Sequence, residues 1–291
     1  MKHIITYLSL IVLLLFVFSA CSDIKEDLSG PVTKAGVHPE GMADAGSENF
    51  HGVTLKNSNW DLKDCQRCHA SDYSGGFTGA NCLTCHTQPA GPEACNTCHG
   101  SFANPERIAP PNDLAGNNET SEPGVGAHSQ HLHLNEIGPE MTCATCHNMD
   151  APGTEPFVFA HIDALPADMK FGGNAILGSA LASYDFTNNT CANTYCHGNF
   201  TFNKADAPEN AQTFYIADAI TGMNQSPVWT AVDNTYNSCG NSCHANPPSG
   251  HIEVPEESCG NCHGAVADNY SNIIDKSKHM NGKVNVFGNE Y

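Results

Sequence analysis

Residues 65–69 read Cys-Gln-Arg-Cys-His, and this arrangement recurs along the chain. Four other segments share the C-x-x-C-H spacing, at 82–86, 95–99, 143–147 and 259–263. Two more end in Cys-His after a longer gap, with four intervening residues in 191–197 and three in 239–244. Fourteen of the 15 cysteines therefore form seven pairs, each followed at once by histidine.

The C-x-x-C-H spacing is typical of covalent haem c attachment. One tight turn presents both sulfurs to the porphyrin edge, and the next residue offers a neutral imidazole to the iron. Three or four intervening residues can loop outward and leave the end points in place. We therefore expect seven haem c groups. The attachment residues would be Cys65, Cys68, Cys82, Cys85, Cys95, Cys98, Cys143, Cys146, Cys191, Cys196, Cys239, Cys243, Cys259 and Cys262. The proximal ligands would be His69, His86, His99, His147, His197, His244 and His263.

Zinc binding and disulfide formation are the alternatives for paired cysteines. Structural zinc sites combine two pairs with spaced ligands, which adjacent Cys-His does not easily provide. Exported proteins also form disulfides. Neither alternative explains why histidine follows every second cysteine.

The remaining histidines nearly match the number of distal ligands that seven six-coordinate haems would need. Outside the leader, which holds His3, eight remain. The distal candidates are His38, His51, His128, His131, His133, His161, His251 and His279. Methionine is the competing ligand and raises the reduction potential. Because histidine is so abundant, we expect mainly bis-histidine haems of low potential.

The densest histidine cluster is His128-Ser-Gln-His131-Leu-His133. His128 and His131 would share one face of a helix, whereas His131 and His133 would share one face of a strand. Either arrangement lets neighbouring ligands on one short segment serve different haems. A zinc site formed by the three histidines is the alternative.

Residues 1–20 have the form of a secretory signal, with Lys2 followed by an apolar run from Ile4 to Phe18. The unpaired Cys21 stands where a bacterial lipoprotein signal carries its modified cysteine, so we expect lipidation there. An uncleaved membrane anchor is the alternative. We expect an exported protein, lipid-anchored in the cell envelope, with the outer membrane favoured on either its periplasmic or its cell-surface face.

The formal charge of −19 argues against a nucleic-acid partner. We expect other redox proteins as partners, including multihaem cytochromes and porin–cytochrome components, with metal ions or minerals as further acceptors. The membrane contact would be through the lipid anchor.

Long amphipathic periods are absent, and Gly, Pro, Asn and Ser recur throughout. We therefore expect a multihaem cytochrome c fold that is haem-cored and mostly coil, with short helices and a few short strands. The expected organisation is a signal peptide (1–20), a lipidated N-terminus and tether (21–45), a tri-haem segment (46–105), a linker or loop (106–126) and a tetra-haem domain (127–291). In the last, 180–186 and 199–203 are expected to pair as a hairpin, Asn188 and Asn189 to form a turn, and 227–232 to form a strand.

The order of motifs across residues 127–291 resembles a known family. It runs from His-x-x-His-Leu (128–132) and C-x-x-C-H (143–147) through the four-residue and three-residue gaps to C-x-x-C-H-Gly (259–264) and His-x-Asn-Gly (279–282). This resembles the multihaem cytochromes with mixed CxxxxCH and CxxCH motifs from dissimilatory metal-reducing bacteria. The resemblance implies an exported lipoprotein of an extracellular electron-transfer chain. It favours His128, His131, His161, His251 and His279 as distal ligands over His38, His51 and His133.

Electron transfer is thus the leading functional hypothesis, with no catalytic residue required. A multihaem reductase acting on nitrite, hydroxylamine or a sulfur oxyanion is the enzymatic alternative, and it would need an open iron position. A subunit of a cytochrome filament or of a porin–cytochrome complex is the structural alternative, which is compatible with the first.

Overall fold

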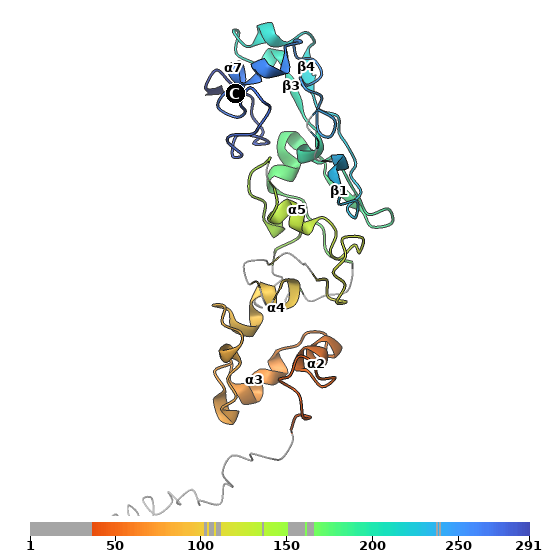
Figure 1. Ribbon diagram of the computed structural model, residues 1–291, viewed down its shortest axis with the longest axis vertical. Coiled ribbons are helices and arrows are strands. Elements are labelled where there is room, and N and C mark those ends of the chain that lie inside the picture. The colour runs from red at the N-terminus through yellow and green to blue at the C-terminus, as the bar shows by residue number, and fades with distance from the viewer. Residues whose placement is uncertain are drawn as a thin grey trace, which may run out of the picture. The chain divides into compact units, whose positions relative to one another are not determined.

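The computed structural model describes residues 37–101, 104, 108, 112–135, 137–150, 161, 166–236, 238 and 240–291. The predicted signal peptide, the lipidation site Cys21 and the attachment residue Cys239 lie outside the described residues, as do parts of the predicted tether and linker. Over the described residues the chain is mostly coil, interrupted by short helices and two- or three-residue strands (Figure 1). Within those ranges, no helix has the length and apolar character needed to cross a bilayer.

The chain forms two compact units, Met1–Asn81 and Cys82–Tyr291. The boundary falls between the first and second cysteine motifs, inside the predicted tri-haem segment. The first unit contains helices α2 (His51–Asn57) and α3 (Lys63–His69) and the 3-10 turn η1 (Gly76–Thr78). Gly76 has a φ of +42°, and a Cβ there would lie 2.6 Å from the backbone nitrogen of Ala70. Glycine therefore lets η1 fold back onto the end of α3.

The second unit carries the remaining elements, most of them a single turn long. Its α-helices are α4 (Cys95–His99), α5 (His128–Leu132) and α7 (Cys259–His263). Its 3-10 helices are η2 (Cys82–Thr84), η3 (Gly91–Glu93), η4 (Cys143–Thr145), η5 (Gly173–Ser179), η6 (Tyr195–His197), η7 (Lys204–Asp206), η8 (Gln212–Phe214), η9 (Asn234–Tyr236) and η10 (Glu256–Ser258). Helix α5 settles the choice left open by the sequence, since 128–132 is helical and not extended.

Three antiparallel hairpins lie among the described residues of this unit. They are β1 (Ser183–Asp185) with β2 (Thr190–Ala192), β3 (Thr201–Asn203) with β4 (Ala219–Thr221), and β5 (Asn285–Val286) with β6 (Asn289–Glu290). Strands form inside both predicted segments, 180–186 and 199–203, but the predicted pairing between them is wrong.

The pairing differs because each segment has another partner. Strand β1 turns back through the predicted turn, where Asn189 has a φ of +52°, and pairs with the strand that carries Cys191. Strand β3 pairs with β4, which the sequence pattern did not indicate. The predicted strand 227–232 is also wrong, because only an isolated bridge joins Val228 to Thr190.

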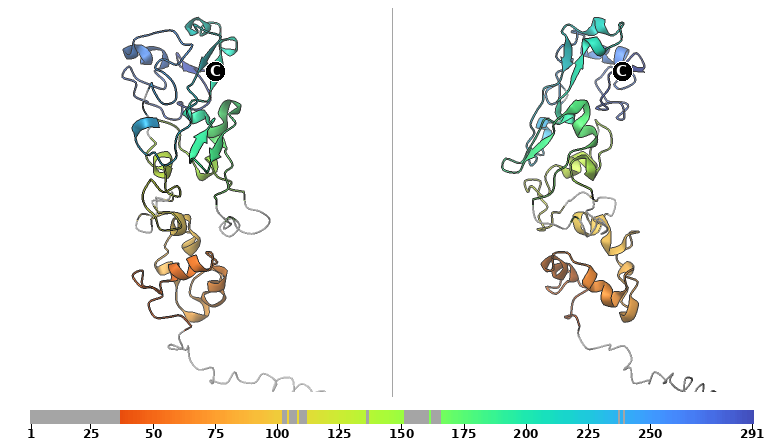
Figure 2. Two further views of the ribbon diagram at one scale, coloured as in Figure 1. Left: turned by 90° about the vertical axis from the view of Figure 1, so that its right-hand side faces the viewer. Right: turned by 180° about the vertical axis from the view of Figure 1, so that it is seen from behind.

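The apolar core is small. Its main cluster consists of Ala207, Ala211, Tyr215 and Ile220, with Val286 and Tyr291 packed against it. The C-terminus accordingly lies beside β3 and β4 (Figures 1 and 2). Among the described residues no large side chain is fully buried, while Phe77 and Leu181 are 95% and 83% exposed. With so little buried apolar surface, the polypeptide alone makes a poor core.

Candidate haem-binding sites

The five regular motifs all lie on helical turns. Three are whole or terminal parts of α3, α4 and α7, and two begin the 3-10 turns η2 and η4. In a helical turn the two cysteines, three residues apart, share a face, and the histidine follows directly. The structure therefore brings each cysteine pair to one side of a single turn, as attachment to one porphyrin edge requires.

The stretched motif 191–197 reaches the same end points differently. Cys191 lies in β2, whereas Cys196 and His197 lie in η6. Between them, Asn193 has a φ of +55° and turns the chain outward. Its backbone carbonyl accepts a hydrogen bond from the Asn199 side chain at 3.0 Å, and its Oδ1 accepts one from Asn224 at 3.1 Å. The extra residues are thus held in an ordered loop.

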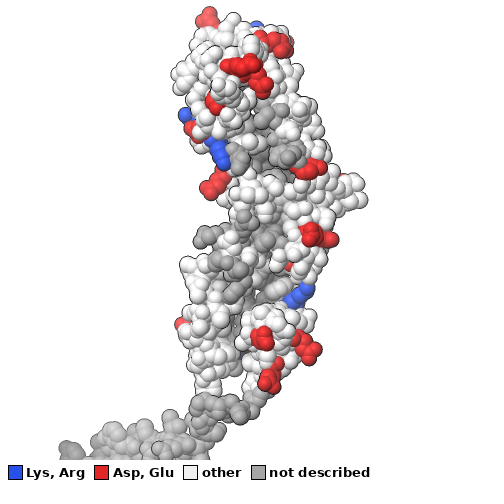
Figure 3. Space-filling model, viewed as in Figure 1, with Lys and Arg blue, Asp and Glu red and all other residues white. Residues whose placement is uncertain are grey.

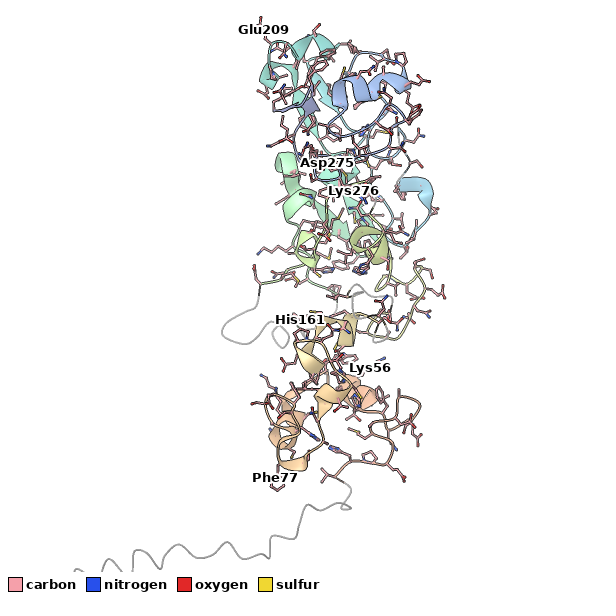
Figure 4. All side chains as sticks on the ribbon, turned by 60° about the vertical axis from the view of Figure 1, so that its left-hand side comes forward. Lys56, Phe77, His161, Glu209, Asp275 and Lys276 are labelled. Atoms are coloured by element: carbon pink, nitrogen blue, oxygen red, sulfur yellow. The ribbon has the colours of Figure 1, made fainter. Side chains whose placement is uncertain are left out.

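Six motif histidines each lie against a histidine from outside the motifs. The ring centres are 5.9 to 6.4 Å apart, and every pair joins one proximal candidate to one distal candidate. The pairs are His69 with His38, His99 with His161, His147 with His128, His197 with His131, His244 with His279, and His263 with His251. Figure 4 shows the second pair's His161 beside α4.

This separation fits one iron between two imidazoles. Metal–imidazole bonds are about 2 Å long, and the ring centre lies roughly 1.1 Å beyond the bonded nitrogen, which predicts centres about 6.2 Å apart. Direct aromatic packing covers a wider range, about 4.5 to 7 Å. Such packing alone would not select one motif and one non-motif histidine in all six pairs. The residues present therefore fit bis-histidine haem.

Hydrogen bonds fix which ring nitrogen faces the partner. Nδ1 of most described histidines contacts a backbone carbonyl, and since a carbonyl only accepts, Nδ1 carries the proton. The acceptors are Ala80 for His69, Val125 for His128, Ala127 for His131, Ala245 for His244, Ile252 for His251, Asn285 for His263 and Ile137 for His279, at 2.5 to 3.1 Å. The lone pair then lies on Nε2, which is the nitrogen that iron would bind.

Burial favours the neutral imidazole at His128, His131, His197 and His279. It lowers the pKa of His128 and of His197 to about 4, with smaller contributions from neighbouring histidines. Burial likewise lowers the pKa of His131 and of His279 below the ordinary value for histidine. A neutral imidazole is the form that ligates a metal, so at neutral pH no proton has to be displaced.

Successive motifs of the second unit are neighbours in space. The pKa of the Cys196 thiol is raised to about 12, mainly by burial and to a smaller extent by the nearby thiols of Cys146 and Cys243. Burial raises the pKa of Cys143, and Cys95 adds to that rise. Thioether bonds would abolish these titrations, but the proximity remains. Four attachment segments, from 95–99 to 239–244, therefore follow one another in chain order.

The seventh motif histidine, His86, follows η2 and is not one of the six pairs described above. Two distal candidates, His51 and His133, also lie outside those six pairs. His51 contacts the carbonyl of Met42 through Nδ1 at 2.9 Å, in the same manner as the paired ligands. His133 has a buried Nε2 without a hydrogen-bond partner in the part of the chain that the structure describes. His38, which the family resemblance did not favour, faces His69.

Disulfides and zinc were the alternatives to haem for these residues. No disulfide is formed between the described cysteines. Within the described ranges, no group of three His, Cys, Asp or Glu side chains could hold a metal ion. In particular, His128, His131 and His133 do not form such a group. A haem iron would need only two protein ligands, so this result leaves the histidine pairs unaffected.

Sequence reasoning missed the residues around the ligands. The carbonyl acceptors belong to the main chain, so no residue type reveals them. The sequence also did not indicate a role for Trp229, whose ring contacts both His128 and His131, because no local pattern in 227–232 relates it to residue 128.

No protein-family model, curated protein or solved structure matches this chain.

Proposed function

We propose that this protein transfers electrons through about seven covalently attached c-type haems, most of them with two histidine ligands. The observation that carries the proposal is the set of six histidine pairs, each joining a motif histidine to one outside the motifs at about one iron's separation. No catalytic residue is required by it.

In this proposal the chain's own residues bind each haem and orient the histidine rings toward the iron. Cysteine pairs on single turns would hold each porphyrin, and the Nδ1–H groups of the histidines donate to fixed carbonyls so that Nε2 faces the iron. When bound, haem would supply one-electron chemistry by alternating between ferric and ferrous iron. The closeness of the attachment segments at Cys95, Cys143 and Cys196 to their neighbours supports passage along the chain order.

The acidic surface of this protein favours a redox partner whose surface is basic. Acidic side chains are dispersed over the face in Figure 3, with only isolated basic ones. Together with the net charge of −19, this favours basic partner surfaces or metal cations over nucleic acid. We propose a lipid-anchored component of the cell envelope, favoured at the outer membrane, that exchanges electrons with other multihaem cytochromes or porin–cytochrome components.

The histidine pairs argue against a reductase. Such an enzyme needs an open iron position, and a facing histidine would close six of the seven sites.

Intact-mass measurement of the protein matured in an exporting, haem-attaching host tests the proposal. We expect the mass of seven haems, a lipid on Cys21 and a low-spin ferric spectrum. A colourless product with zinc or with paired disulfides would overturn the proposal. A strong high-spin signal would shift it to the reductase, and five haems would show that the stretched sites are empty.

A further inference from the structure

The side chain of Trp229 contacts both proposed distal ligands of helix α5, His128 and His131. Its indole meets the His128 ring edge-on, with centres 4.7 Å apart, and lies nearly parallel to the His131 ring at 5.6 Å. These two histidines face different motif histidines, His147 and His197. One side chain therefore contacts the ligands of two separate candidate haem sites.

The indole is fixed to the turn that precedes α5. Its Nε1–H donates to the carbonyl of Pro123 at 2.8 Å. The same turn supplies the Val125 and Ala127 carbonyls that accept from His128 and His131. By holding this turn, Trp229 acts on the acceptors that orient both rings as well as on the rings themselves.

The backbone is shaped to admit the indole. Gly126 has a φ of +43°, and a Cβ at this position would lie 2.0 Å from Nε1 of Trp229. Any other residue would collide with the ring while also adopting an unfavourable left-handed conformation. The close approach of the Trp229 indole therefore depends on glycine at position 126.

Trp229 is also anchored beside a cysteine of one of these sites. Its backbone N–H donates to the Asn189 carbonyl at 2.6 Å, and the carbonyl of Pro227 accepts from the backbone N–H of Cys191 at 3.0 Å. Cys191 begins the stretched motif whose histidine faces His131. The segment 227–229 therefore connects the covalent attachment of this site to its distal ligand.

We propose that Trp229 is a positioning residue shared by two haem sites, setting the ring orientation of His128 and His131 and shielding both from water. This rests on the proposed function. The paired rings differ in their interplanar angles, 15° for His128 with His147 and 68° for His131 with His197. The angle between two axial imidazoles sets the anisotropy of the ferric signal in electron paramagnetic resonance. Shielding disfavours the more charged ferric form and so raises the potential.

The test compares three variants of the full-length, matured protein. Trp229→Ala removes the ring, Trp229→Phe keeps a ring but loses the bond to Pro123, and Trp60→Phe changes the other tryptophan of the chain, which lies in the first unit. Intact mass gives the haem count, a potentiometric titration gives the midpoint potentials, and electron paramagnetic resonance gives the ligand-plane signature.

We expect seven haems in every variant. Trp229→Ala should lower the midpoint potentials of two of the seven haems by roughly 28 mV. At a fixed applied potential this shift changes the ferric-to-ferrous ratio about threefold, because 59 mV corresponds to a tenfold change. The same variant should also change two low-spin signals. Trp229→Phe should move the same two in the same direction by less, and Trp60→Phe should move none.

An unchanged titration and spectrum in both Trp229 variants would overturn the inference, as would a change spread evenly over all seven haems. If Trp229→Ala does not accumulate, Trp229→Phe decides alone by the same criterion. A wild-type protein without haem would instead defeat the proposed function, so the two failures are distinguishable.

Discussion

The motifs at 259–263 and 191–197 reach the same result by different backbones. The first is a five-residue helix, α7, whereas the second runs from strand β2 through a left-handed asparagine into the 3-10 turn η6. Yet His263 faces His251, and His197 faces His131, at the same centre separation of 6.2 Å. Two different local folds can therefore place a motif histidine at the same distance from a histidine outside the motifs.

Removing the cysteines should give the largest effect and tests whether the two motifs are equivalent. The double variants Cys259→Ser with Cys262→Ser, and Cys191→Ser with Cys196→Ser, should each lose one haem of seven by intact mass, because each pair would hold one porphyrin. Ser258→Ala, next to the regular motif, is the control and should retain all seven. The equivalence would fail if the 191/196 variant kept seven haems.

Replacing the distal ligands should give the next largest effect. His251→Met and His131→Met should each raise the potential of one haem, by on the order of 0.1 V, because thioether ligation favours ferrous iron. A potentiometric titration measures both shifts. Leu132→Met, on the same short helix, adds a methionine without removing a ligand and should shift neither. Two unmoved titrations would show that these histidines are not ligands.

Substituting the loop residue Asn193 should lower the free energy of unfolding more than a matched substitution in the regular motif 259–263. Asn193→Ala forces alanine into a left-handed conformation and removes the acceptor for Asn224, which should cost about 1–2 kcal/mol of the free energy of unfolding. Asn193→Gly keeps the conformation and should cost less. Asn261→Ala, the matched change within α7, should cost under about 0.5 kcal/mol. Denaturant unfolding of the haem-loaded protein gives all three values, and equal losses at 193 and 261 would contradict the distinction.

The smallest expected effect concerns the support of α7. Asn285 is buried, and its side chain donates to the Lys278 carbonyl at 3.2 Å, while its own carbonyl accepts from His263. Asn285→Ala should cost about 1 kcal/mol through the lost side-chain bond and leave the haem count at seven, because the acceptor for His263 is main chain. Thermal unfolding with intact mass checks both. Loss of a haem would show that the side chain does more than hold the C-terminal loop.

Local features of this fold could be predicted, and distant ones could not. The coil-rich character and the turn at Asn189 follow from nearby residues, whereas the histidine spacing at 128–133 allowed a helix and a strand alike. The pairing of β3 with β4 depends on the chain's return after the fifteen residues that contain η7 and η8, which no local pattern encodes.

The candidate ligands show the same limit. Counting gave eight candidate distal histidines, but not which motif each one faces. His279 is oriented by the carbonyl of Ile137, 142 residues earlier, and so reaches His244. Such a contact is set by how the chain is wound, and the residue types alone do not reveal it. The same is true of Trp229, which reaches back 106 residues to Pro123.

The main-chain acceptors of the histidines have a consequence for how this protein can change. A side-chain acceptor would tie each ligand to a second residue type, so that every such pair had to mutate together. With peptide carbonyls in that role, substitutions at Val125, Ala127 or Ile252 that preserve the backbone path leave the imidazole orientation intact. Drift of the intervening sequence is therefore compatible with an unaltered ligand geometry, and the cysteines and histidines carry nearly all of the chemical constraint.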